Sequence, residues 1–414
     1  MQRGPFSWIV AIAALLAALA IAAEPAPKNL AAVTTVWYHN SHADLIAGRL
    51  FLTHTMDGKG ERPNLRLASL YTDQVPKNDI SRKWAAEYKF PIVPTVRQAL
   101  TLGDERLAVD GVLLLAEMGT YPESETGQIV YPKRAFFSEI VNVFRASGRV
   151  VPVFVDKHLA DNWRDAKWLY DTARAEGIPL MAGSSIPVLW RYPPTDVPRD
   201  AALKEIVAIS YHTLDAYGFH GLEMVQCLAE RRAGGETGIR RVRCLVDDAV
   251  WQATDQGLFD GRLLQAALDR CQRPGPRGAE MRAKVPHPVL WIMEYADGLR
   301  ASVLTLNGAV GEWAAAWRDE AGRTDSTLFW TQEERPLAHF THQLKGIERM
   351  MHTGKPAWPV ERTLLTSGAL DALLISKTRG GLPVETPYLE FSYRSDWNWQ
   401  QPPPPPTGRP LQEQ

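Results

Sequence analysis

Two short stretches of the sequence place side chains that can hold or transfer a proton next to apolar segments. Asp156, Lys157 and His158 follow Val153–Val155, and His220 stands at the start of a helical pattern. An ammonium group can hydrogen-bond a substrate hydroxyl, and burial that lowers its pKa toward neutrality lets it exchange a proton. An imidazole titrates near physiological pH, which suits a base. The residues alone also fit a surface lysine and a packed helical histidine, so both readings stay open at this point.

The elements that would position these groups alternate in the first half of the chain. Short apolar runs typical of buried strands occur at 32–36, 65–71, 109–115, 150–155 and 178–182. Between them, apolar residues recur at helical spacing at 80–88 and 163–173. Strands alternating with helices predict an α/β fold with a Rossmann-like, doubly wound parallel sheet over residues 30–185. In such a sheet a ligand lies beyond the carboxyl ends of the strands.

The second half of the chain has a different pattern. Strand-like runs at 206–211, 240–246, 289–295 and 300–306 accompany a helical stretch at 220–232. The last two runs flank Asp297-Gly298, a pair that favours a tight hairpin turn. We therefore predict a C-terminal α/β domain over 186–395, with a mainly antiparallel open sheet and helices packed on one side. Helices at 340–351 and 360–376 are expected to return the chain toward the first domain.

The two ends of the chain lie outside this pattern. Arg3 precedes an apolar run at 8–20 and small residues before Glu24, which predicts a signal peptide over 1–23 and export to the periplasm or the cell exterior. The run is shorter than the about 20 residues that a membrane-spanning helix needs, so no stable span is expected. The proline run in the tail at 400–414 favours an extended segment that packs against no other element.

Composition excludes some classes of partner. The 46 basic and 47 acidic residues give a net charge of −1, which offers no electrostatic footprint for nucleic acid. Cys227, Cys244 and Cys271 form no CxxC pair, and no metal site is predicted. In an oxidising compartment Cys227 and Cys244 could be bridged, although their spacing alone does not show it.

The order of these elements and several local phrases resemble the glucose–fructose oxidoreductase/inositol dehydrogenase/MocA (Gfo/Idh/MocA) family over residues 30–385. The segment 109–115 resembles the family's fourth strand, and Asp156-Lys157-His158 lies where the family carries its Glu-Lys-Pro motif. The phrase ending in His220 resembles the Gly-x-His element, and the stretch 354–376 resembles the return helix. Their order and spacing carry the resemblance more than any single phrase.

The resemblance implies an oxidoreductase that acts on a hydroxyl or carbonyl of a sugar or cyclitol with a tightly held nicotinamide cofactor. It implies that Lys157 meets the reacting hydroxyl and that His220 acts as the base. The family's aspartate would stand at Ala216, whereas this chain has Asp215 one position earlier. Either a local shift lets Asp215 orient the imidazole, or that role is lost.

The cofactor region departs from what a dinucleotide needs. Glycines after the first strand normally let the backbone approach the pyrophosphate, whereas residues 34–42 contain none and bring two aromatic rings and two histidines into that space. The acid that would accept ribose hydroxyls is present at the end of the second strand. The resemblance implies NAD or NADP, and the residues expected to contact it are Thr35, Trp37, Tyr38, His39, Asn40, Asp73, Glu117 and Asp156.

The remaining expectations concern the substrate and other partners. A small carbohydrate-like molecule is expected to contact His158, Arg191 and Tyr217, although Arg191 also fits interdomain packing. By resemblance, the exposed face of the antiparallel sheet is a plausible homo-oligomer surface. A sugar lyase or hydratase that uses Lys157 and His220 without redox chemistry stays open. So does a cofactor-free ligand-binding protein on the same fold.

Overall fold

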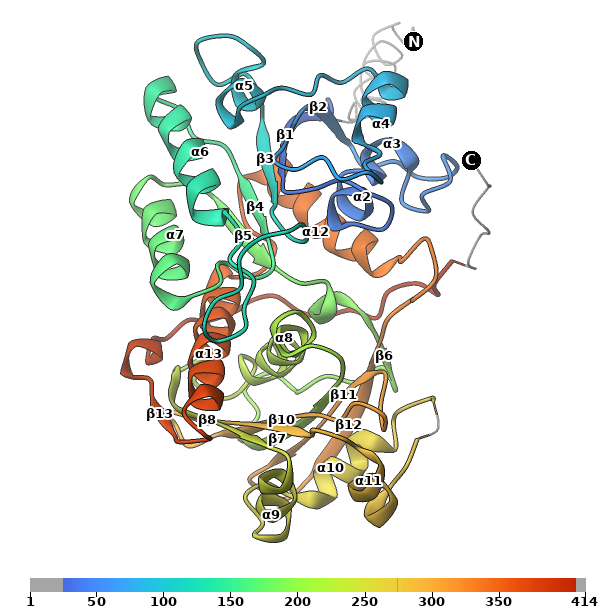
Figure 1. The fold of residues 1–414 in the computed structure, drawn as a ribbon, viewed down its shortest axis with the longest axis vertical. Helices are drawn as coiled ribbons and strands as arrows, with labels where there is room; N and C mark the ends of the chain where they lie inside the picture. The colour runs from blue at the N-terminus through green and yellow to red at the C-terminus, as the bar shows by residue number, and fades with distance from the viewer. Residues whose placement is uncertain (1–24, 274, 407–414) are drawn as a thin grey trace, which may run out of the picture.

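The computed structural model describes residues 25–273 and 275–406. The predicted signal peptide at 1–23 therefore lies outside the described residues, as does the end of the proline-rich tail from residue 407. Among the described residues, no helix is both long enough and apolar enough to cross a membrane. The described chain is organised around two β-sheets, drawn in the upper and lower halves of Figure 1.

The first sheet is parallel and has the strand order β2-β1-β3-β4-β5. Its strands are β1 (Lys28–Thr34), β2 (Leu65–Thr72), β3 (Gly111–Leu115), β4 (Val153–Asp156) and β5 (Leu180–Gly183). A single parallel bridge between Leu70 and Ile92 continues the sheet beyond β2. The strand order reverses between β1 and β3, and the loops after these strands leave the sheet at the point where doubly wound folds bind their ligands.

Helices cover both faces of this sheet because neighbouring side chains on a strand point to opposite sides. Along β1, Ala31 and Val33 enter one core, and Leu30 and Ala32 enter the other. The first core is covered by α5 (Val96–Thr101), α6 (Lys133–Ser147) and α7 (Trp163–Ala175). The second is covered by α2 (His42–Ile46), α3 (Arg49–Leu52), α4 (Ser81–Tyr88) and α12 (His339–Thr353). The late helix α12 thus returns to the first sheet, as the sequence predicts (Figure 1).

The second sheet has eight strands in the order β13-β8-β9-β10-β7-β11-β12-β6. They are β6 (Trp190–Tyr192), β7 (Leu203–Ser210), β8 (Ile239–Val246), β9 (Val289–Tyr295), β10 (Arg300–Thr305), β11 (Trp313–Asp319), β12 (Thr324–Trp330) and β13 (Val384–Glu385). The β7/β10 pair is parallel and the other neighbouring pairs are antiparallel. The predicted hairpin at Asp297-Gly298 joins β9 to β10. The two sheets together confirm the predicted fold class.

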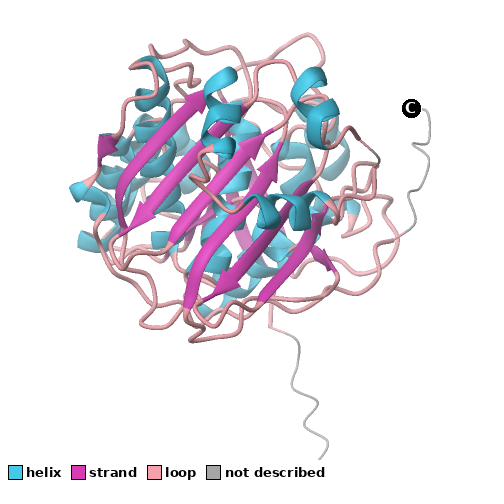
Figure 2. Cartoon of the chain, turned by 90° about the horizontal axis from the view of Figure 1, so that it is seen from below, coloured by secondary structure: helices cyan, strands magenta, loops and turns pink. Residues whose placement is uncertain are grey.

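Helices also cover both faces of the second sheet, which corrects the sequence-based expectation of one covered face. α8 (Phe219–Ala229) and α13 (Val360–Thr378) pack on the face toward the first sheet. The opposite face is covered by α9 (Asp248–Asp255), α10 (Gly261–Leu268) and α11 (Gly278–Lys284), visible in front of the strands in Figure 2. Apolar residues of these helices, such as Leu263, pack on Val207 and Ile209 of β7.

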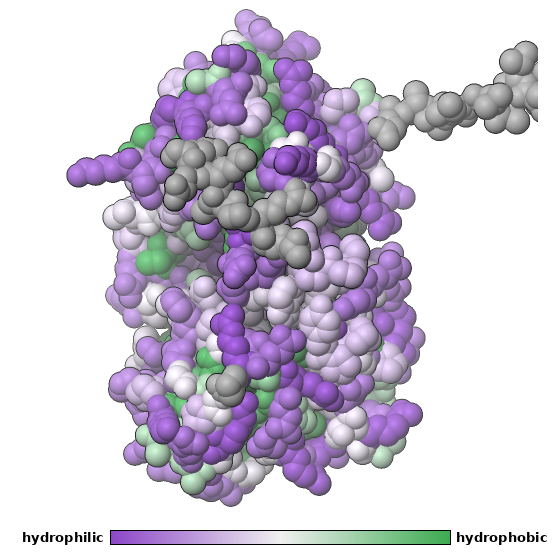
Figure 3. Space-filling model, turned by 90° about the vertical axis from the view of Figure 1, so that its right-hand side faces the viewer, coloured by the Kyte–Doolittle hydropathy of each residue, from purple (hydrophilic) through white to green (hydrophobic). Residues whose placement is uncertain are grey.

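The face that was expected to serve as a homo-oligomer surface is therefore not exposed. Residues 248–284 supply the covering helices, and their short helical repeats were not recognised in the sequence. On the side of the molecule drawn in Figure 3, the surface is largely hydrophilic, with only small apolar areas. An oligomer would have to use a surface other than this sheet face.

The thiols and the proline-rich tail also differ from expectation. Cys227, Cys244 and Cys271 are all free thiols, so no disulfide joins Cys227 to Cys244. The tail at 401–406 is extended but packs against the chain. The indole of Trp190 donates to the carbonyl of Pro403 at 2.6 Å, and the amide of Gln332 donates to the carbonyl of Pro406 at 2.6 Å. Proline keeps its carbonyl acceptor, which is what these side chains bind.

A buried ion pair connects α8 to α13 on the face of the second sheet that is turned toward the first sheet. Glu230 follows α8, and its carboxylate accepts from the Arg362 guanidinium at 2.5 and 3.0 Å and from the Tyr393 hydroxyl at 2.9 Å. Both charged side chains are 1% exposed. A buried pair of this kind is costly to break from one side, because the remaining charge loses its partner in a place that water does not reach.

We expect Glu230→Gln to lower the free energy of unfolding by about 3–5 kcal/mol, because the Arg362 guanidinium is left buried without its counter-charge. Urea unfolding followed by tryptophan fluorescence measures this. The matched control is Glu280→Gln, which breaks the exposed pair with Lys284 and should cost less than about 0.5 kcal/mol. Equal losses in the two variants would contradict the assigned role of the buried pair.

Candidate active site

The ends of two neighbouring strands bring opposite charges together at the carboxyl edge of the first sheet. Glu117 follows β3, and Lys157 follows β4. Because β3 and β4 are adjacent and parallel, their ends meet, and the Lys157 Nζ donates to the Glu117 Oε1 at 2.8 Å. Lys133, at the start of α6, lies beneath them with its Nζ 3.8 Å from the Glu117 Oε2. Lys133 also donates to the carbonyls of Asp156 and His158 at 2.9 and 2.5 Å.

This arrangement sets the protonation of the three groups. Burial opposes the charged form of Glu117, but the ammonium groups of Lys157 and Lys133 outweigh it and hold its pKa below the ordinary range. Burial likewise opposes the charged form of Lys157, but Glu117 and Asp156 outweigh it and raise its pKa. Burial lowers the pKa of Lys133 to about 8, although the same carboxylates act in the opposite direction. Lys157 therefore stays charged, and Lys133 has the pKa nearer neutrality.

Sequence reasoning thus selected one lysine of the pair and missed the other. Burial does not lower the pKa of Lys157 toward neutrality, the condition under which it could exchange a proton, because two carboxylates face it. The sequence does contain a feature that points to Lys133: it directly follows Pro132 and so stands in the first turn of the helix after β3. A lysine at that position comes to the carboxyl edge of the sheet together with Glu117.

Asp156 is tied to the loop after β1 and not left open to a cofactor. Its Oδ2 lies 2.5 Å from the His42 Nδ1, and its Oδ1 accepts from the backbone N–H of Lys157 at 2.9 Å. The His42 ring in turn meets the edge of Phe340 from α12 at 5.2 Å. Burial opposes ionisation of Asp156, but the His42 imidazole and the nearby lysines hold its pKa below the ordinary range.

A π-helical turn at Leu214–Gly218 brings Asp215 to the same region from the second domain. The Oδ2 of Asp215 accepts from the backbone N–H of Ile129 at 3.3 Å, and its Oδ1 has no hydrogen-bond partner within the described chain. Burial raises the pKa of Asp215, while the Ile129 N–H and the ammonium of Lys157 act against that rise.

His158 contacts the backbone of this turn. Its Nε2 lies 2.8 Å from the carbonyl of Asp215, so this nitrogen carries the proton and donates. Its ring meets the edge of Phe219 at 4.4 Å. Burial and the charge of Lys157 lower the pKa of His158 to about 3, so the ring is neutral. His158 therefore holds the two domains together at this point.

His220 lies at the start of α8 beside an aromatic group from the second sheet. Its ring centroid is 5.5 Å from that of Trp313 and 6.1 Å from that of Tyr217, and Tyr217 stacks on Trp313 at 5.5 Å. The Nδ1 of His220 is buried and has no hydrogen-bond partner within the described chain. Burial and the positive charge of Lys157 lower its pKa well below the ordinary value. Among the described residues, the Asp215 carboxylate contacts Ile129 and His158 and not His220, so it does not orient this imidazole.

Glu117 and Asp215 both line a cavity of about 380 Å³. Residues from three elements line it: the segment after β3, the π-helical turn and the end of α13. Glu117, Tyr131 and Asp215 supply acidic or phenolic groups, and Thr126 and Thr213 supply hydroxyls. Glu117 is 5% exposed and its Oε2 has no hydrogen-bond partner within the described chain. The second oxygens of Glu117 and Asp215 are buried beside Lys133 and His158, at 3.8 and 3.5 Å, and neither accepts a hydrogen bond from a group within the described chain.

The residues expected to contact a cofactor are placed in different surroundings. Trp37 is fully buried and stacks with Phe51 and Phe90 at 6.2 Å, so it belongs to the core and not to a binding groove. His39 and Asn40 are exposed, and the Asn40 side chain accepts from Arg335 at 2.7 Å. Three more of the expected residues form side-chain hydrogen bonds with the segment after β3: Thr35, Tyr38 and Asp73.

The loop after β1 does not fit a pyrophosphate. The backbone N–H of Tyr38 donates to the Ser41 Oγ at 3.1 Å, and the N–H of Asn40 donates to the Asp44 Oδ2 at 3.0 Å. These are N–H groups that a phosphate-binding loop offers to its ligand. Here the chain's own side chains occupy them, and the Asp44 carboxylate is itself paired with Arg335 at 2.9 Å. Donors that are already satisfied make this loop unsuited to a dinucleotide pyrophosphate.

Arg191 is not brought to the site. It is fully buried, pairs with the Asp196 Oδ1 at 2.6 Å, and lies between the rings of Phe329 and Trp399 at 4.6 and 4.4 Å. These contacts are those of a packing residue. The sequence allowed either substrate contact or packing for Arg191, and the structure shows packing. The expected contact of Arg191 with substrate is not supported.

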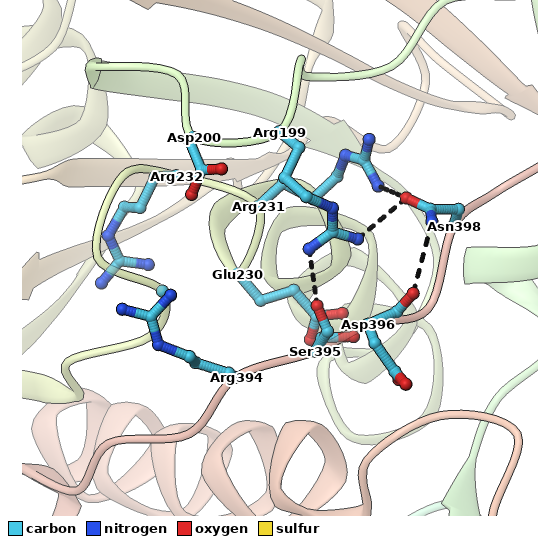
Figure 4. A pocket seen from close by; sticks show the side chains of 10 residues that line it. Arg199, Asp200, Glu230, Arg231, Arg232, Arg394, Ser395, Asp396 and Asn398 are labelled. Atoms are coloured by element: carbon cyan, nitrogen blue, oxygen red, sulfur yellow. Dashed lines mark hydrogen bonds between the residues drawn. The ribbon is translucent and has the colours of Figure 1, made fainter.

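A larger cavity, of about 660 Å³, lies at the C-terminal end of α8 (Figure 4). Arg199 there donates to the Ser395 carbonyl at 2.6 Å and to the Asn398 side chain at 2.8 Å. Arg232 pairs with Glu236 at 2.9 Å. The arginine side chains that line this cavity are thus largely bound within the chain already. The lining of this cavity includes no residue that the sequence singled out for chemistry.

Comparison with known proteins identifies the class of fold. No protein-family model matches the chain, and no curated protein sequence matches it. Among solved structures, GenD2 from gentamicin A biosynthesis, in complex with NAD, is similar at a TM-score of 0.55, with 13% identity over 87% of this chain and 97% of that chain. The apo scyllo-inositol dehydrogenase from Lactobacillus casei matches at a TM-score of 0.53, with 9% identity over 87% and 98%.

A third solved structure is also similar to this chain. The myo-inositol 2-dehydrogenase from Lactobacillus plantarum matches at a TM-score of 0.52, with 9% identity over 87% of this chain and 99% of that chain. At such identities the likeness establishes the fold. The chain has the two-domain fold of these dehydrogenases, which confirms the resemblance drawn from the sequence at the level of the fold.

We expect Glu117→Gln to remove a pH-dependent part of the stability. A carboxyl whose folded-state pKa lies below 4.5 stabilises the fold above that pH, and the contribution is lost as the pH falls through the lower folded-state value. At neutral pH the variant should lose about 3–5 kcal/mol, because two buried ammonium groups lose their counter-charge. The difference from the native protein should shrink as the pH falls below 4.5.

Urea unfolding across this pH range measures both effects. Glu105→Gln, at an exposed position, is the control and should leave the stability and its pH dependence unchanged. A constant difference between native protein and Glu117→Gln at every pH would contradict the ion-pair assignment.

Proposed function

We propose that the protein is an enzyme that carries out acid–base chemistry on a sugar- or cyclitol-like polyol in the cavity between its two domains. The observation that supports this most directly is the pair of carboxyl groups of Glu117 and Asp215. They line one cavity, and their surroundings move their pKa values in opposite directions. Such a split is how one site provides an ionised carboxylate and a carboxylic acid at the same pH.

The simplest reaction for this pair is the elimination or addition of water. Glu117, held ionised, takes a proton from carbon. Asp215 gives its proton to the hydroxyl that leaves from the neighbouring carbon, so that a double bond forms and water departs. The reverse transfers add water to the double bond. Hydroxyl groups of a polyol suit the polar side chains that line the cavity, because each hydroxyl can both donate and accept a hydrogen bond.

The remaining residues of the site have supporting parts in this proposal. Lys157 holds Glu117 ionised and stays charged itself. Neutral His220 keeps a free Nδ1 beside the stacked rings of Tyr217 and Trp313. Tyr217 directly follows Ala216, which lines the cavity, and we infer that Tyr217 contacts the substrate there.

A second candidate is an oxidoreductase that passes hydride between the polyol and a tightly held NAD or NADP. It is favoured by Lys157 and His220, which lie close enough for the charge of one to lower the pKa of the other, at positions that the resemblance marks as catalytic. The likeness to GenD2, solved with NAD, also favours it. The unfavourable loop after β1 places it second.

Mass spectrometry of small molecules released by denaturing the purified protein separates the two candidates. A dinucleotide near one per chain would favour the oxidoreductase. Absence of a dinucleotide, with no thermal shift on adding NAD, NADH, NADP or NADPH, favours chemistry by the chain's own groups.

We expect Asp215→Asn to lower the rate by about 10²–10⁴-fold, the usual contribution of a positioned acid. In the native protein, activity should fall on the alkaline side of the pH profile as Asp215 loses its proton, above the ordinary aspartate pKa, and on the acid side as Glu117 gains one. The variant should lose the alkaline limb and keep the acid limb. Proton NMR in D₂O over a panel of sugars, cyclitols and sugar acids detects both exchange and elimination.

The matched control is Glu123→Gln, which changes a carboxyl group on the lining of the same cavity. It should keep both limbs of the pH profile and most of the rate. A rate unchanged in Asp215→Asn, with the alkaline limb intact, would remove the proposed acid.

We further infer that the protein is exported, on the strength of the apolar run and small residues at 1–23. Expression with the full N-terminus should yield a chain that begins at Glu24. Intact mass measurement of the product reads this directly, and a product that retains Met1 in the cytoplasmic fraction would contradict it.

A further inference from the structure

The segment between β3 and α6, residues 117–131, is much longer than the usual connection between a strand and a helix, and we call it the strap. Near its start it lies along the loop after β1. The Thr35 hydroxyl donates to the carbonyl of Glu117 at 2.8 Å, and the Tyr38 hydroxyl contacts the Met118 Sδ at 3.2 Å. Two residues expected to bind a cofactor are thus bound to the strap.

The strap next covers the end of β2. Gln74 and the backbone of Thr120 exchange two hydrogen bonds, at 2.8 and 2.9 Å. The Tyr121 hydroxyl donates to the Asp73 Oδ2 at 2.7 Å, and the Tyr71 hydroxyl donates to the Asp73 Oδ1 at 2.9 Å. An acid at the end of this strand is the group that accepts ribose hydroxyls in dinucleotide-binding folds. Both of its oxygens accept tyrosine hydroxyls here.

The strap is closely packed where it crosses these loops. Gly119 has a φ of +103°, which favours glycine, and a Cβ built there would lie 2.9 Å from the Tyr121 ring and 3.3 Å from a methyl group of Val36. The space between the loops after β1 and β2 is therefore filled at this point. A bound adenosine would have to displace the strap.

The far end of the strap reaches the second domain. Glu123 and Ile129 pair across a turn, in which the Ser124 N–H donates to the Gln128 carbonyl at 2.8 Å. The Ile129 N–H then donates to the Asp215 Oδ2 at 3.3 Å, and residues of this turn line the cavity with Asp215. One continuous segment thus connects the end of β2, Glu117 and Asp215.

We propose that the strap is a built-in occupant of the groove in which this fold holds a dinucleotide, and that its far end positions Asp215 through the Ile129 N–H. The first part is independent of the reaction assigned to the cavity. The second part rests on the proposed function, because it gives Asp215 its place as the acid.

Hydrogen–deuterium exchange of the whole protein tests the first part. The probes are NADH and NADPH at millimolar concentration. We expect exchange of the strap amides and of the residues around Asp73 to be unchanged by either probe. Faster exchange in the strap together with protection at Asp73 would show a dinucleotide displacing the strap, and would overturn the proposal.

Tyr121→Phe provides a second measurement, because it removes one hydroxyl and leaves the ring in place. We expect exchange of the strap amides to rise by about tenfold, as loss of one hydrogen bond to a carboxylate allows. Tyr170→Phe is the matched control, because the hydroxyl of Tyr170, on α7, donates to the carboxylate of Glu361, on α13, at 2.8 Å. Its effect should stay at these two helices. Unchanged exchange of the strap amides in Tyr121→Phe would count against the proposal.

The second part is tested by the pKa of Asp215, read by carbon-13 NMR titration of its carboxyl carbon, which needs no substrate. The Ile129 N–H lowers this pKa, so Ile129→Pro, which lacks the donor, should raise it. Ile129→Ala keeps the N–H and should leave it unchanged. Equal values in both variants would overturn the positioning role. If the pKa of Asp215 rises in Ile129→Pro as expected but the native protein is inactive on the substrate panel, the result counts against the proposed reaction and not against the role of the strap.

Discussion

The buried ion pair between Lys157 and Glu117 is the interaction on which the rest of this site depends. Both groups leave neighbouring parallel strands at the same edge, so the topology of the sheet makes their contact unavoidable. Taking two charges out of water is costly unless each is paired and hydrogen-bonded. Lys133 completes the arrangement beneath them, where it also binds the carbonyls of the β4 loop. The edge of the sheet is thereby held together by charge.

That ion pair also explains how the two carboxyl groups of the cavity differ. Glu117 faces two ammonium groups and is held ionised, whereas Asp215, on a turn from the other domain, is raised in pKa by burial. The strap begins at Glu117 and ends its course beside Asp215, so it fixes both members of the pair. In the account proposed here, the strap occupies the groove that related folds use for a dinucleotide and positions the proposed acid and base.

The sequence was sufficient for most of the fold and for part of the site. Short apolar runs placed β2 and β9, and helical apolar patterns placed α4, α7 and α13, close to their observed bounds, because regular burial leaves a regular pattern. The helices α9 to α11 were missed, since short helices leave weak repeats. Lys157, His158 and Asp215 were singled out through the family resemblance and lie near one another, but the residues that they contact come from distant segments. The Ile129 N–H and the strap's bonds to Asp73 involve backbone groups and tertiary contacts that a sequence pattern does not encode.

The most direct test of this account is the order in which Glu117 and Asp215 release their protons. Carbon-13 NMR titration of carboxyl carbons, with the two resonances assigned from Glu117→Gln and Asp215→Asn, measures it in the intact protein. The account predicts that Glu117 titrates below its ordinary value and Asp215 above its own, with Asp215 still protonated where Glu117 is ionised. The reverse order, or two ordinary values, would contradict the assignment of a paired acid and base.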